Sequence, residues 1–385
     1  MMQSKFNVAI ITHPFSDQTG QTILANLVDV LLPISDHIYV ISGDFSYKSN
    51  KIHVLRTGAI TTKEPFFSWV SKQVQAQIKG AYYLIKLSKK FDIAFFFLGG
   101  RVHLLPLLVA KILGKKVVVA ATGSAEGTTK GVYSNRLFGV GGLISKIAKM
   151  LERTCFLLSD QVAVESPSAV HFLKLSRYRK KIAINGAMYV DTNLFSVRKS
   201  INVRQNLVGF IGRLSKEKGV MNFVKAIPLI LKCRNDVEFL IGGDGQLLNN
   251  LMEELKRNGC SEKTTFTGWI PHDKLPDYLS KLKLLVLPSY SEGIPGIVQE
   301  AMACGTPVLA TPVGGVPDLI KDGETGFILE NNSPECIADS VIKVLNSKDL
   351  EKIVKNARKL IEEEYAYEPM VRKCRNALSI LMQKN

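Results

Sequence analysis

The alternation of short apolar runs with longer amphipathic stretches is the feature that most limits how this chain can fold. Short runs rich in Val, Ile and Phe recur along its 385 residues. Because strands are short and β-branched while helices carry apolar residues on one face, this alternation predicts strand–helix–strand units and mainly parallel sheets. The strands expected in a first series are Asn7–Thr12, His37–Ser42, Ile52–Leu55, Ile93–Leu98, Lys116–Ala121, Gln161–Val164 and Ile182–Ile184. Those of a second series are Leu207–Ile211, Val237–Ile241, Thr265–Thr267, Leu284–Leu287, Pro307–Ala310 and Gly326–Leu329.

The two series predict two domains. Residues Asn185–Ser200 lie between them, carry Asn, Gly, Asp and Thr, and have no clear periodicity. A chain of 385 residues is also too long for one ordinary core and suits two α/β domains. We therefore expect an α/β fold with a doubly wound, Rossmann-like domain at residues 1–185, a linker at 186–200, a second such domain at 201–365 and a C-terminal helix at 366–385. The helical pattern Glu351–Leu381 is long enough to reach back towards the first domain.

Composition narrows the class of partner and the compartment. The balance of 50 Lys and Arg against 34 Asp and Glu indicates an anionic partner, which leaves nucleic acid, anionic lipid and a phosphorylated substrate open. The six cysteines have no C-x-x-C spacing, so we expect reduced thiols. No charge-free run is long enough for a membrane span, because Arg101 and His103 interrupt Ile93–Ala110, which predicts a strand followed by a helix. The apolar stretch Val8–Thr12 is too short for a signal peptide, and we predict a cytoplasmic protein.

The segment Ser289–Gly305, "SYSEGIPGIVQEAMACG", is the first candidate for chemistry. A helix that starts near Gly296 would point free amide groups and its positive dipole end at the loop before it, which suits a phosphate. Glu292 in the loop and Glu300 in the helix would flank that phosphate, and carboxylates are good acceptors for sugar hydroxyl groups. Taken alone, Glu292 is better explained as a solvated residue and Glu300 as a residue of the helix surface.

The segment Gly209–Gly219, "GFIGRLSKEKG", is the second candidate. Its cations Arg213, Lys216 and Lys218 lie where a helix is about to begin, a position that disfavours positive charge by about 0.3–1 kcal/mol each. An anion bound there would offset this cost, so Arg213 and Lys218 are placed to clamp a diphosphate. By itself the segment is better explained as a solvated turn.

Together with Gly242–Gly245, these segments resemble the family 4 retaining glycosyltransferases of the GT-B fold, the glycosyl transferases group 1. The resemblance implies two Rossmann-like domains that face each other across a deep cleft, the first on the acceptor side and the second binding a nucleotide-sugar donor. It implies that Glu292 contacts donor-sugar hydroxyls and that Glu300, seven intervening residues further on, contacts the ribose. Arg213 and Lys218 match the family's diphosphate pair.

The site residues that the resemblance implies fall into two groups. Those implied as catalytic are Glu292, Arg213 and Lys218, and those implied as donor-binding are Gly20, Gly212, Gly243, Trp269, Ile270, Gly293, Gly296, Ile297 and Glu300. Trp269 and Ile270 stand where the family cradles the base. The segments Asn185–Phe195, with an insertion at Ala187–Tyr189, and Glu324–Leu329 are further matches. The family's histidine near the donor sugar is replaced by Gly123, and His13 and His103 are weak substitutes for it.

The activity implied is transfer of a hexose-type sugar from a UDP- or GDP-linked donor to a glycan or lipid-linked acceptor, with retention, in cell-surface polysaccharide or glycoconjugate synthesis. The chain has no Asp-x-Asp, so we expect no metal and no cofactor besides the nucleotide-sugar co-substrate. An epimerase, hydrolase or phosphorylase of the same fold is the first alternative, and a non-catalytic protein that binds nucleic acid or a membrane is the second. We expect no nucleic acid as a partner, because paired carboxylates repel a phosphate backbone.

The remaining positive charge is gathered in the first domain. A basic run occupies Lys174–Lys181, Lys146, Lys149 and Arg153 interrupt the apolar helix pattern Leu137–Leu157, and aromatic and basic residues alternate in Phe66–Lys90. This mixture predicts peripheral contact with an anionic membrane on its inner face. A solvated basic face with its apolar side in the core explains the pattern equally well.

Overall fold

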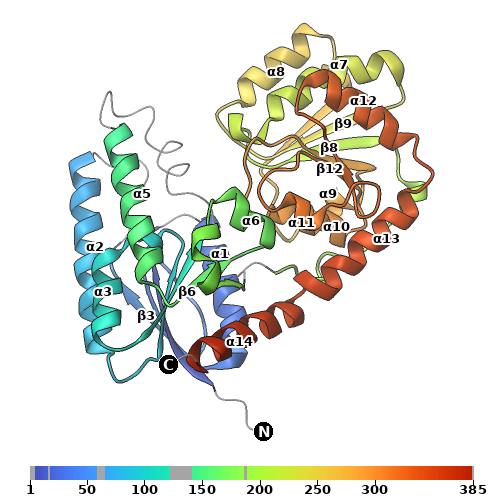
Figure 1. Cartoon of the computed structure of the whole chain (residues 1–385). Coiled ribbons are helices and arrows are strands. Elements are labelled where there is room, and N and C mark those ends of the chain that lie inside the picture. The colour runs from blue at the N-terminus through green and yellow to red at the C-terminus, as the bar shows by residue number, and fades with distance from the viewer. Residues whose placement is uncertain (1–4, 16–17, 59–65, 122–140, 186–188, 384–385) are drawn as a thin grey trace. The chain divides into compact units, whose positions relative to one another are not determined.

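The computed structural model describes residues 5–15, 18–58, 66–121, 141–185 and 189–383. The chain forms two compact units (Figure 1), one within residues 1–188 and 370–385 and the other at residues 189–369. The predicted linker at 186–200 is thus not a separate segment, because its residues from Tyr189 onward belong to the second unit. Each unit is built on one parallel sheet.

The first unit contains a seven-stranded sheet in the order β3-β2-β1-β4-β5-β6-β7. Its strands are β1 (Phe6–Thr12), β2 (Ser35–Ser42), β3 (Ile52–Arg56), β4 (Ile93–Phe97), β5 (Lys116–Ala121), β6 (Gln161–Val164) and β7 (Ile182–Ile184). All neighbouring strands pair in parallel. All seven strands predicted from the sequence are present, because near-continuous runs of Val, Ile and Phe are what a parallel sheet buried on both faces requires.

Helices cover this sheet on its faces. The α-helices are α1 (Gln18–Leu31), α2 (Phe66–Lys86), α3 (Leu104–Ile112), α5 (Gly141–Leu158) and α6 (Pro167–Phe172), and the 3₁₀ segments are η1 (Leu32–Ile34), η2 (Gly100–Val102) and η3 (Ser176–Lys181). Helices α2, α3 and α5 lie side by side (Figure 1). Leu107 of α3 and Phe156 of α5 are buried in the core against the sheet. The prediction of a strand followed by a helix in Ile93–Ala110 is confirmed by β4 and α3.

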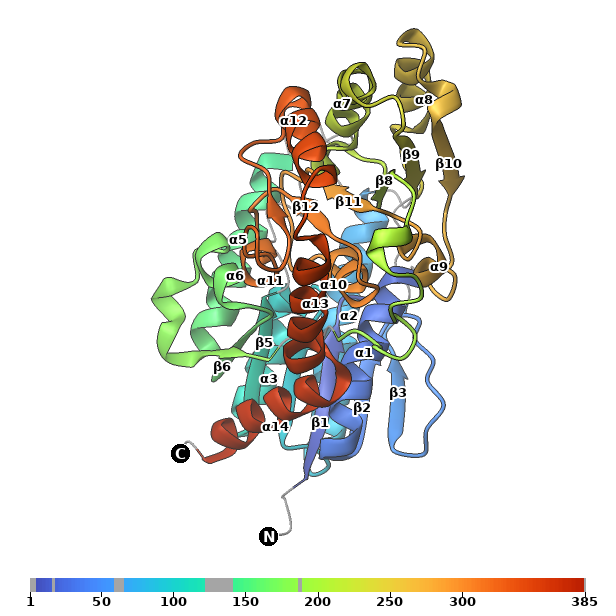
Figure 2. The same ribbon diagram turned by 90° about the vertical axis from the view of Figure 1, so that its right-hand side faces the viewer.

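The second unit contains a six-stranded parallel sheet in the order β10-β9-β8-β11-β12-β13. Its strands are β8 (Leu207–Ile211), β9 (Glu238–Gly242), β10 (Thr264–Gly268), β11 (Leu284–Leu287), β12 (Val308–Ala310) and β13 (Phe327–Ile328). The helical segments are η4 (Ile201–Val203), η5 (Lys216–Lys218), α7 (Val220–Cys233), α8 (Leu248–Arg257), η6 (Ser261–Lys263), α9 (Leu275–Leu279), α10 (Gly296–Ala303), α11 (Val316–Leu319), α12 (Pro334–Leu345) and α13 (Leu350–Leu360). Figure 2 shows α7 and α12 packed side by side beside this sheet. The expected α/β class with two doubly wound sheets is therefore confirmed.

Both sheets have the same switch point. In the first, the chain passes from β1 to β2 on one side and later returns to place β4 on the other side of β1. In the second, β9 and β11 flank β8 in the same way. Ligands of open parallel sheets bind outside the carboxyl ends of the strands at such a point, because the loops diverge there and leave a crevice. The fold therefore predicts a ligand site at the loops that follow β8 and β11.

The C-terminal segment is not the single helix that its pattern predicts. Helix α13 passes into a π-helical turn at Ile361–Tyr365, and a separate helix, α14, covers Tyr367–Gln383. Cys374, Leu378 and Leu381 of α14 are buried. The side-chain amide of Gln161 donates a hydrogen bond to the carbonyl of Ala377 at 3.1 Å. This contact joins the end of the chain to β6 in the first unit.

Two simpler expectations can also be compared with the structure. None of the six cysteines is paired with another, which agrees with reduced thiols. Within the ranges that the structure describes, we find no helix that is both long enough and apolar enough to cross a bilayer.

Candidate functional site

An ion pair occupies the switch point of the second sheet. Lys218 ends η5, in the loop after β8, and Glu292 lies in the loop after β11. The Lys218 ammonium nitrogen lies 2.8 Å and 2.7 Å from the two carboxylate oxygens of Glu292. Only 5% of the Glu292 side chain and 25% of the Lys218 side chain are exposed. Two of the three residues predicted to be catalytic are therefore in direct contact.

Neighbouring loops fix the carboxylate of Glu292. The hydroxyl of Ser289 donates to Oε1 of Glu292 at 2.6 Å, and the hydroxyl of Thr311 donates to the carbonyl of Ser289 at 2.5 Å. The amide of Gly315 donates to the carbonyl of Gly293, a predicted donor-binding residue, at 2.7 Å. These bonds connect the loops after β11 and β12, so Glu292 is held in one orientation before any ligand arrives.

Close backbone approach brings the loops after β8 and β11 together. Gly219 has φ +67°, and a Cβ added there would lie 2.0 Å from the carbonyl oxygen of Pro288. The amide of Tyr290 donates to the carbonyl of Glu217 at 2.9 Å. Only glycine allows both the left-handed backbone and this approach. Gly219 therefore sets the separation at which Lys218 reaches Glu292.

The loops after β8, β9 and β10 stack on one another through glycines. The amide of Gly212 donates to the carbonyl of Gly242 at 3.0 Å, and the amide of Gly243 donates to that of Gly268 at 2.8 Å. Gly243 has φ +120°, and a Cβ there would lie 1.9 Å from the carbonyl oxygen of Gly212. The predicted donor-binding residues Gly212 and Gly243 are thus neighbours at the carboxyl edge of the sheet.

Helix α10 begins in the same loop as Glu292. It starts at Gly296, as the sequence predicts, and its N-cap, Pro295, offers no side chain that could bond the first amides. No acidic residue stands in the first turn. The amides of Gly296 and Ile297 and the positive end of the helix dipole are therefore suited to an anion.

Glu300, one and a third turns into α10, pairs with a residue that sequence reasoning missed. Its Oε1 lies 2.8 Å from Nε2 of His272, which follows the Trp269–Ile270 pair after β10. The hydrogen bond to Glu300 is the main cause that raises the pKa of His272, partly offset by burial. The ring of Phe195 lies 5.1 Å from that of His272, centroid to centroid. The only signal in the sequence was the position of His272, three residues after Trp269.

The predicted base-binding residues differ in exposure. Trp269 is 68% exposed at the end of β10, which leaves its ring face available for stacking. Ile270 is buried, and a Cβ added at Gly242 would lie 2.8 Å from its Cδ1. Ile270 thus packs against the end of β9, while the side chain of Trp269 is exposed to solvent.

Arg213, the third predicted catalytic residue, is not part of the ion pair at Glu292. Its side chain is 71% exposed, and Nη1 lies 3.5 Å from Oε1 of Glu217, four residues later. An exposed pair of this length contributes little to stability. Arg213 is therefore free to leave Glu217 for a stronger anion at low cost in folding free energy.

The first unit places its candidates at the corresponding switch point. Gly20 lies in the first turn of α1, where a Cβ would stand 2.7 Å from the ring of Phe15. A ring nitrogen of His13, after β1, lies 3.2 Å from the amide nitrogen of Gln73. His103 is 2% exposed, has no hydrogen-bond partner among the described residues for either ring nitrogen, and its pKa is lowered to about 3, chiefly by burial. Gly123 lies outside the described residues.

A metal ion would need several ligating side chains close together. In the part of the chain that the structure describes, no three His, Cys, Asp or Glu side chains are grouped so that they could hold a metal ion.

Two doubly wound parallel units are the architecture of the GT-B glycosyltransferases. Solved structures agree with this fold. Sucrose-phosphate synthase of Thermosynechococcus elongatus superposes with a TM-score of 0.78 at 18% identity, over 99% of this chain and 100% of that one. Anabaena HepE, solved in complex with UDP, superposes with a TM-score of 0.72 at 17% identity, over 97% of this chain and 100% of its own.

The sequence comparisons agree with this class. Residues 191–360 match the family model described as glycosyl transferases group 1. An uncharacterized glycosyltransferase of Methanocaldococcus jannaschii is 29% identical over 66% of this chain and 69% of its own length. The alpha-D-kanosaminyltransferase of Streptomyces kanamyceticus is 27% identical over 68% of this chain and 69% of its own. The protein is a glycosyltransferase.

Proposed function

We propose that this protein is a retaining, family 4 glycosyltransferase that moves a hexose-type sugar from a UDP- or GDP-linked donor to a glycan or lipid-linked acceptor. The observation that carries the proposal is the contact of Lys218 with Glu292 at the switch point of the second sheet, beside the uncapped start of α10. A half-buried cation and an uncapped helix start together suit a diphosphate, and a fixed carboxylate suits the hydroxyl groups of a sugar.

Each side chain has a role that its surroundings support. Lys218 and the exposed Arg213 would neutralise the charge that develops on the diphosphate as the glycosidic bond breaks. The amides of Gly296 and Ile297 would add the helix dipole to that stabilisation. Because fixed cations and amides supply this charge, we propose that turnover needs no metal ion. An excess of chelator should therefore leave the rate unchanged.

The nucleoside would lie along the edge formed by β10 and α10. Trp269 offers an exposed ring face for the base, and Glu300, oriented by His272, offers a carboxylate to the ribose. Among the similar structures, HepE was solved with UDP and with UDP-glucose. The alpha-D-kanosaminyltransferase and the 2-deoxystreptamine glucosyltransferase of Streptomyces kanamyceticus are sugar transferases by name. These names support a nucleotide-sugar donor here.

The donor can be identified by thermal shift. UDP-, GDP- and ADP-sugars are each added to the protein, and the one that binds should raise the melting temperature, by an amount that grows with the logarithm of its concentration. Failure of all three classes of donor to shift the melting temperature would contradict the proposal.

Turnover of labelled donor then separates a transferase from its rivals. An epimerase, hydrolase or phosphorylase of the same fold would consume donor without a sugar acceptor, whereas a transferase yields an acceptor-linked product with the donor's anomeric configuration. Arg213→Ala should lower kcat by about 10²-fold, because one charge-stabilising group is lost. Lys216→Ala, which removes another exposed cation from the same loop, is the matched control and should leave kcat unchanged.

A further inference from the structure

Three neighbouring helices of the first unit expose apolar side chains that belong to no core. In α2 the exposed apolar residues recur every three or four positions, which places them on one side of the helix: Val70, Val74, Ile78, Tyr82 and Ile85. Helix α3 repeats the pattern with Leu105, Leu108 and Ile112, and α5 repeats it with Ile147, Met150, Leu157 and Leu158. The buried sides of these helices pack on the sheet, so each helix is apolar on two sides.

We call the exposed sides of α2, α3 and α5 together the helical face. The three helices form one layer (Figure 1), with α3 in contact with both of its neighbours. Ile112, at the end of α3, is 83% exposed. Exposed apolar residues that continue across adjacent elements mark an interaction surface, whereas isolated ones do not. The sequence left open whether the apolar side of these segments lies in the core, and the structure places a second apolar side outside it.

The charge on these helices has one sign. They carry seven Lys and Arg residues, namely Lys72, Lys79, Lys86, Lys111, Lys146, Lys149 and Arg153. The one carboxylate that they contain is that of Glu152, and it lies 3.1 Å from Nε of the buried Arg101. Lys111 pairs with Asp160 at 2.7 Å, and the other cations leave the charge of the helical face positive.

A basic pocket lies beside the helical face. It has a volume of about 360 Å³ and lies between α5, α6 and η3. Lys149 and Arg153 of α5 line it on one side, and Lys174 and Arg177 line it on the other. Phe172, 41% exposed, forms part of its apolar lining. The carboxylate of Glu152 also lines the pocket, but it is paired with Arg101. The four cations therefore leave the lining positive, which favours a phosphate group that is attached to an apolar body.

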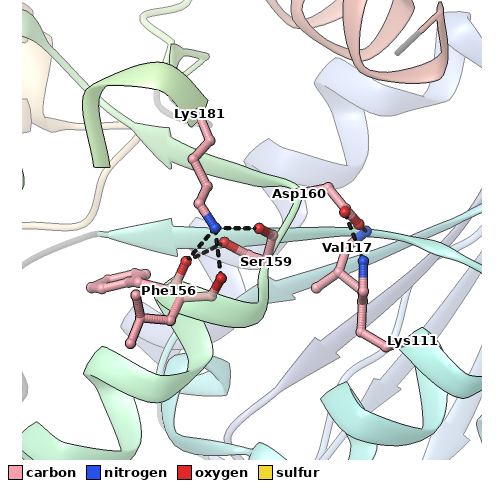
Figure 3. A network of polar contacts seen from close by, with 7 residues as sticks. Lys111, Val117, Phe156, Ser159, Asp160 and Lys181 are labelled. Atoms are coloured by element: carbon pink, nitrogen blue, oxygen red, sulfur yellow. Dashed lines mark hydrogen bonds and ion pairs between the residues drawn. The ribbon is translucent and has the colours of Figure 1, made fainter. Parts of the chain in front are cut away.

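A network of polar contacts joins the end of η3 to the end of α5 (Figure 3). The ammonium group of Lys181 donates to the carbonyls of Phe156, Leu157 and Ser159 at 3.1, 2.6 and 2.8 Å, which satisfies the last turn of α5. Asp160 accepts from the amide of Val117 at 2.8 Å. Lys181 of the basic run is therefore a structural residue, and the cations before it are left to face outward.

We infer that the helical face binds the surface of an anionic phospholipid bilayer, with lipid phosphates taken up by the basic pocket. Apolar side chains that enter the interface and cations that meet the headgroups are the two contributions that hold amphipathic helices at a membrane. A nucleic acid would use the cations and leave the apolar residues in water. A second copy of the same face would bring like charges together. The inference does not depend on the reaction proposed above, because its test measures lipid binding without turnover.

The test is co-sedimentation of the full chain with vesicles. We expect binding to vesicles of phosphatidylcholine mixed with phosphatidylglycerol, weak binding to phosphatidylcholine alone, and a loss of binding as salt is raised. Inorganic phosphate added as a competitor distinguishes the two sources of the anion. If free phosphate displaces the protein from vesicles when chloride at the same ionic strength does not, the pocket alone holds it and the apolar contribution is overturned.

Two sets of variants separate the contributions. Lys174→Ala with Arg177→Ala should weaken vesicle binding by about 25-fold, since each cation near an anionic surface contributes a factor of about five. Ile78→Ser, Ile112→Ser and Met150→Ser together should weaken it by at least about tenfold, and because these side chains are exposed the fold should be retained.

The matched control is Met252→Ser with Lys256→Glu on α8 of the second unit, which also replaces an exposed apolar residue and a cation. This variant should bind vesicles as the wild type does. Equal binding by all variants would overturn the inference. The inference would also be overturned if the chain formed a dimer and the substitutions at Ile78, Ile112 and Met150 dissociated it. The helical face would then be an interface between two copies.

Discussion

The pair formed by Lys218 and Glu292 predicts that replacing Lys218 destabilises the protein more than replacing Glu292. At 2.7 Å and an effective dielectric constant of about 20, the direct attraction is about 6 kcal/mol, most of which offsets the cost of removing both charges from water. Lys218→Met leaves a carboxylate of which only 5% is exposed, and within the described part of the chain only the Ser289 hydroxyl then donates to it. Breaking a buried pair costs about 3–5 kcal/mol. Because Lys218 keeps a quarter of its surface exposed, we expect the free energy of unfolding to fall by about 3 kcal/mol.

The reverse substitution should be milder. Glu292→Gln keeps the shape of the side chain and a hydrogen-bonding group for Ser289, and the ammonium group of Lys218 can still reach water, so we expect a loss of about 1 kcal/mol. The double variant should be more stable than Lys218→Met alone, with a coupling energy of about 2 kcal/mol. Glu292→Gln is accordingly the better variant for testing turnover, because it alters the site with the least effect on folding.

The assay is urea unfolding of the four proteins of the cycle by circular dichroism, with hydrogen exchange of β8 and β11 peptides to assign the transition to the second unit. The exposed pair of Lys355 and Glu351, 3.1 Å apart and four residues apart, gives a control cycle in which coupling should stay below about 0.5 kcal/mol. The reasoning is refuted if Lys218→Met is no less stable than Glu292→Gln, or if the coupling at the site is no larger than in the control cycle.

Three further predictions concern groups around the site. The pKa of His272 is raised in the folded protein, mainly by its hydrogen bond to Glu300, so its contribution to stability is complete below its unfolded pKa of about 6.5 and is lost as the pH rises through the raised value. The melting temperature of His272→Asn should lack that decline, and an unchanged pH profile would contradict the prediction. Gly219→Ala should cost more than about 3 kcal/mol, because it combines positive φ with a clash against a backbone carbonyl. Gly323→Ala, which has φ +72° and no atom within 4 Å, should cost only about 1 kcal/mol in the same urea titration, and equal costs would refute the clash. Arg204→Lys should destabilise the protein by about 3 kcal/mol, because an ammonium group cannot satisfy the several carbonyls to which this buried guanidinium donates. A melting temperature within 2 °C of wild type corresponds to only about 0.5–1 kcal/mol and would exclude that role.

Most of the fold could be predicted because it depends on local pattern. Every predicted strand is present within a few residues, since a parallel strand buried on both faces is a continuous apolar run that can be recognised without its neighbours. The C-terminal segment was less predictable. Its amphipathic pattern runs on through the π-helical turn at Ile361–Tyr365, and only the packing of α13 and α14 in different units divides it there.

The residues of the candidate site could be predicted from the sequence, but the contacts between them could not. Glu292, Lys218 and Gly296 were recognised from their loops, and the helix start at Gly296 is where the glycine and proline pattern predicts it. The bond between Lys218 and Glu292 spans 74 positions, and the bond between His272 and Glu300 spans 28. Such contacts depend on which strands are neighbours, and periodicity carries no information on strand order.

The sequence by itself determined the class of fold, the positions of the strands and the residue types in each loop, because these follow from short-range periodicity and from glycine and proline chemistry. Only the tertiary structure decided which charges meet, since Lys218 reaches Glu292 through the approach of two loops at Gly219. It also decided that α2, α3 and α5 are apolar on a second, outward side. A helix pattern records which residues share a side, but the neighbours that cover that side are supplied by the rest of the chain.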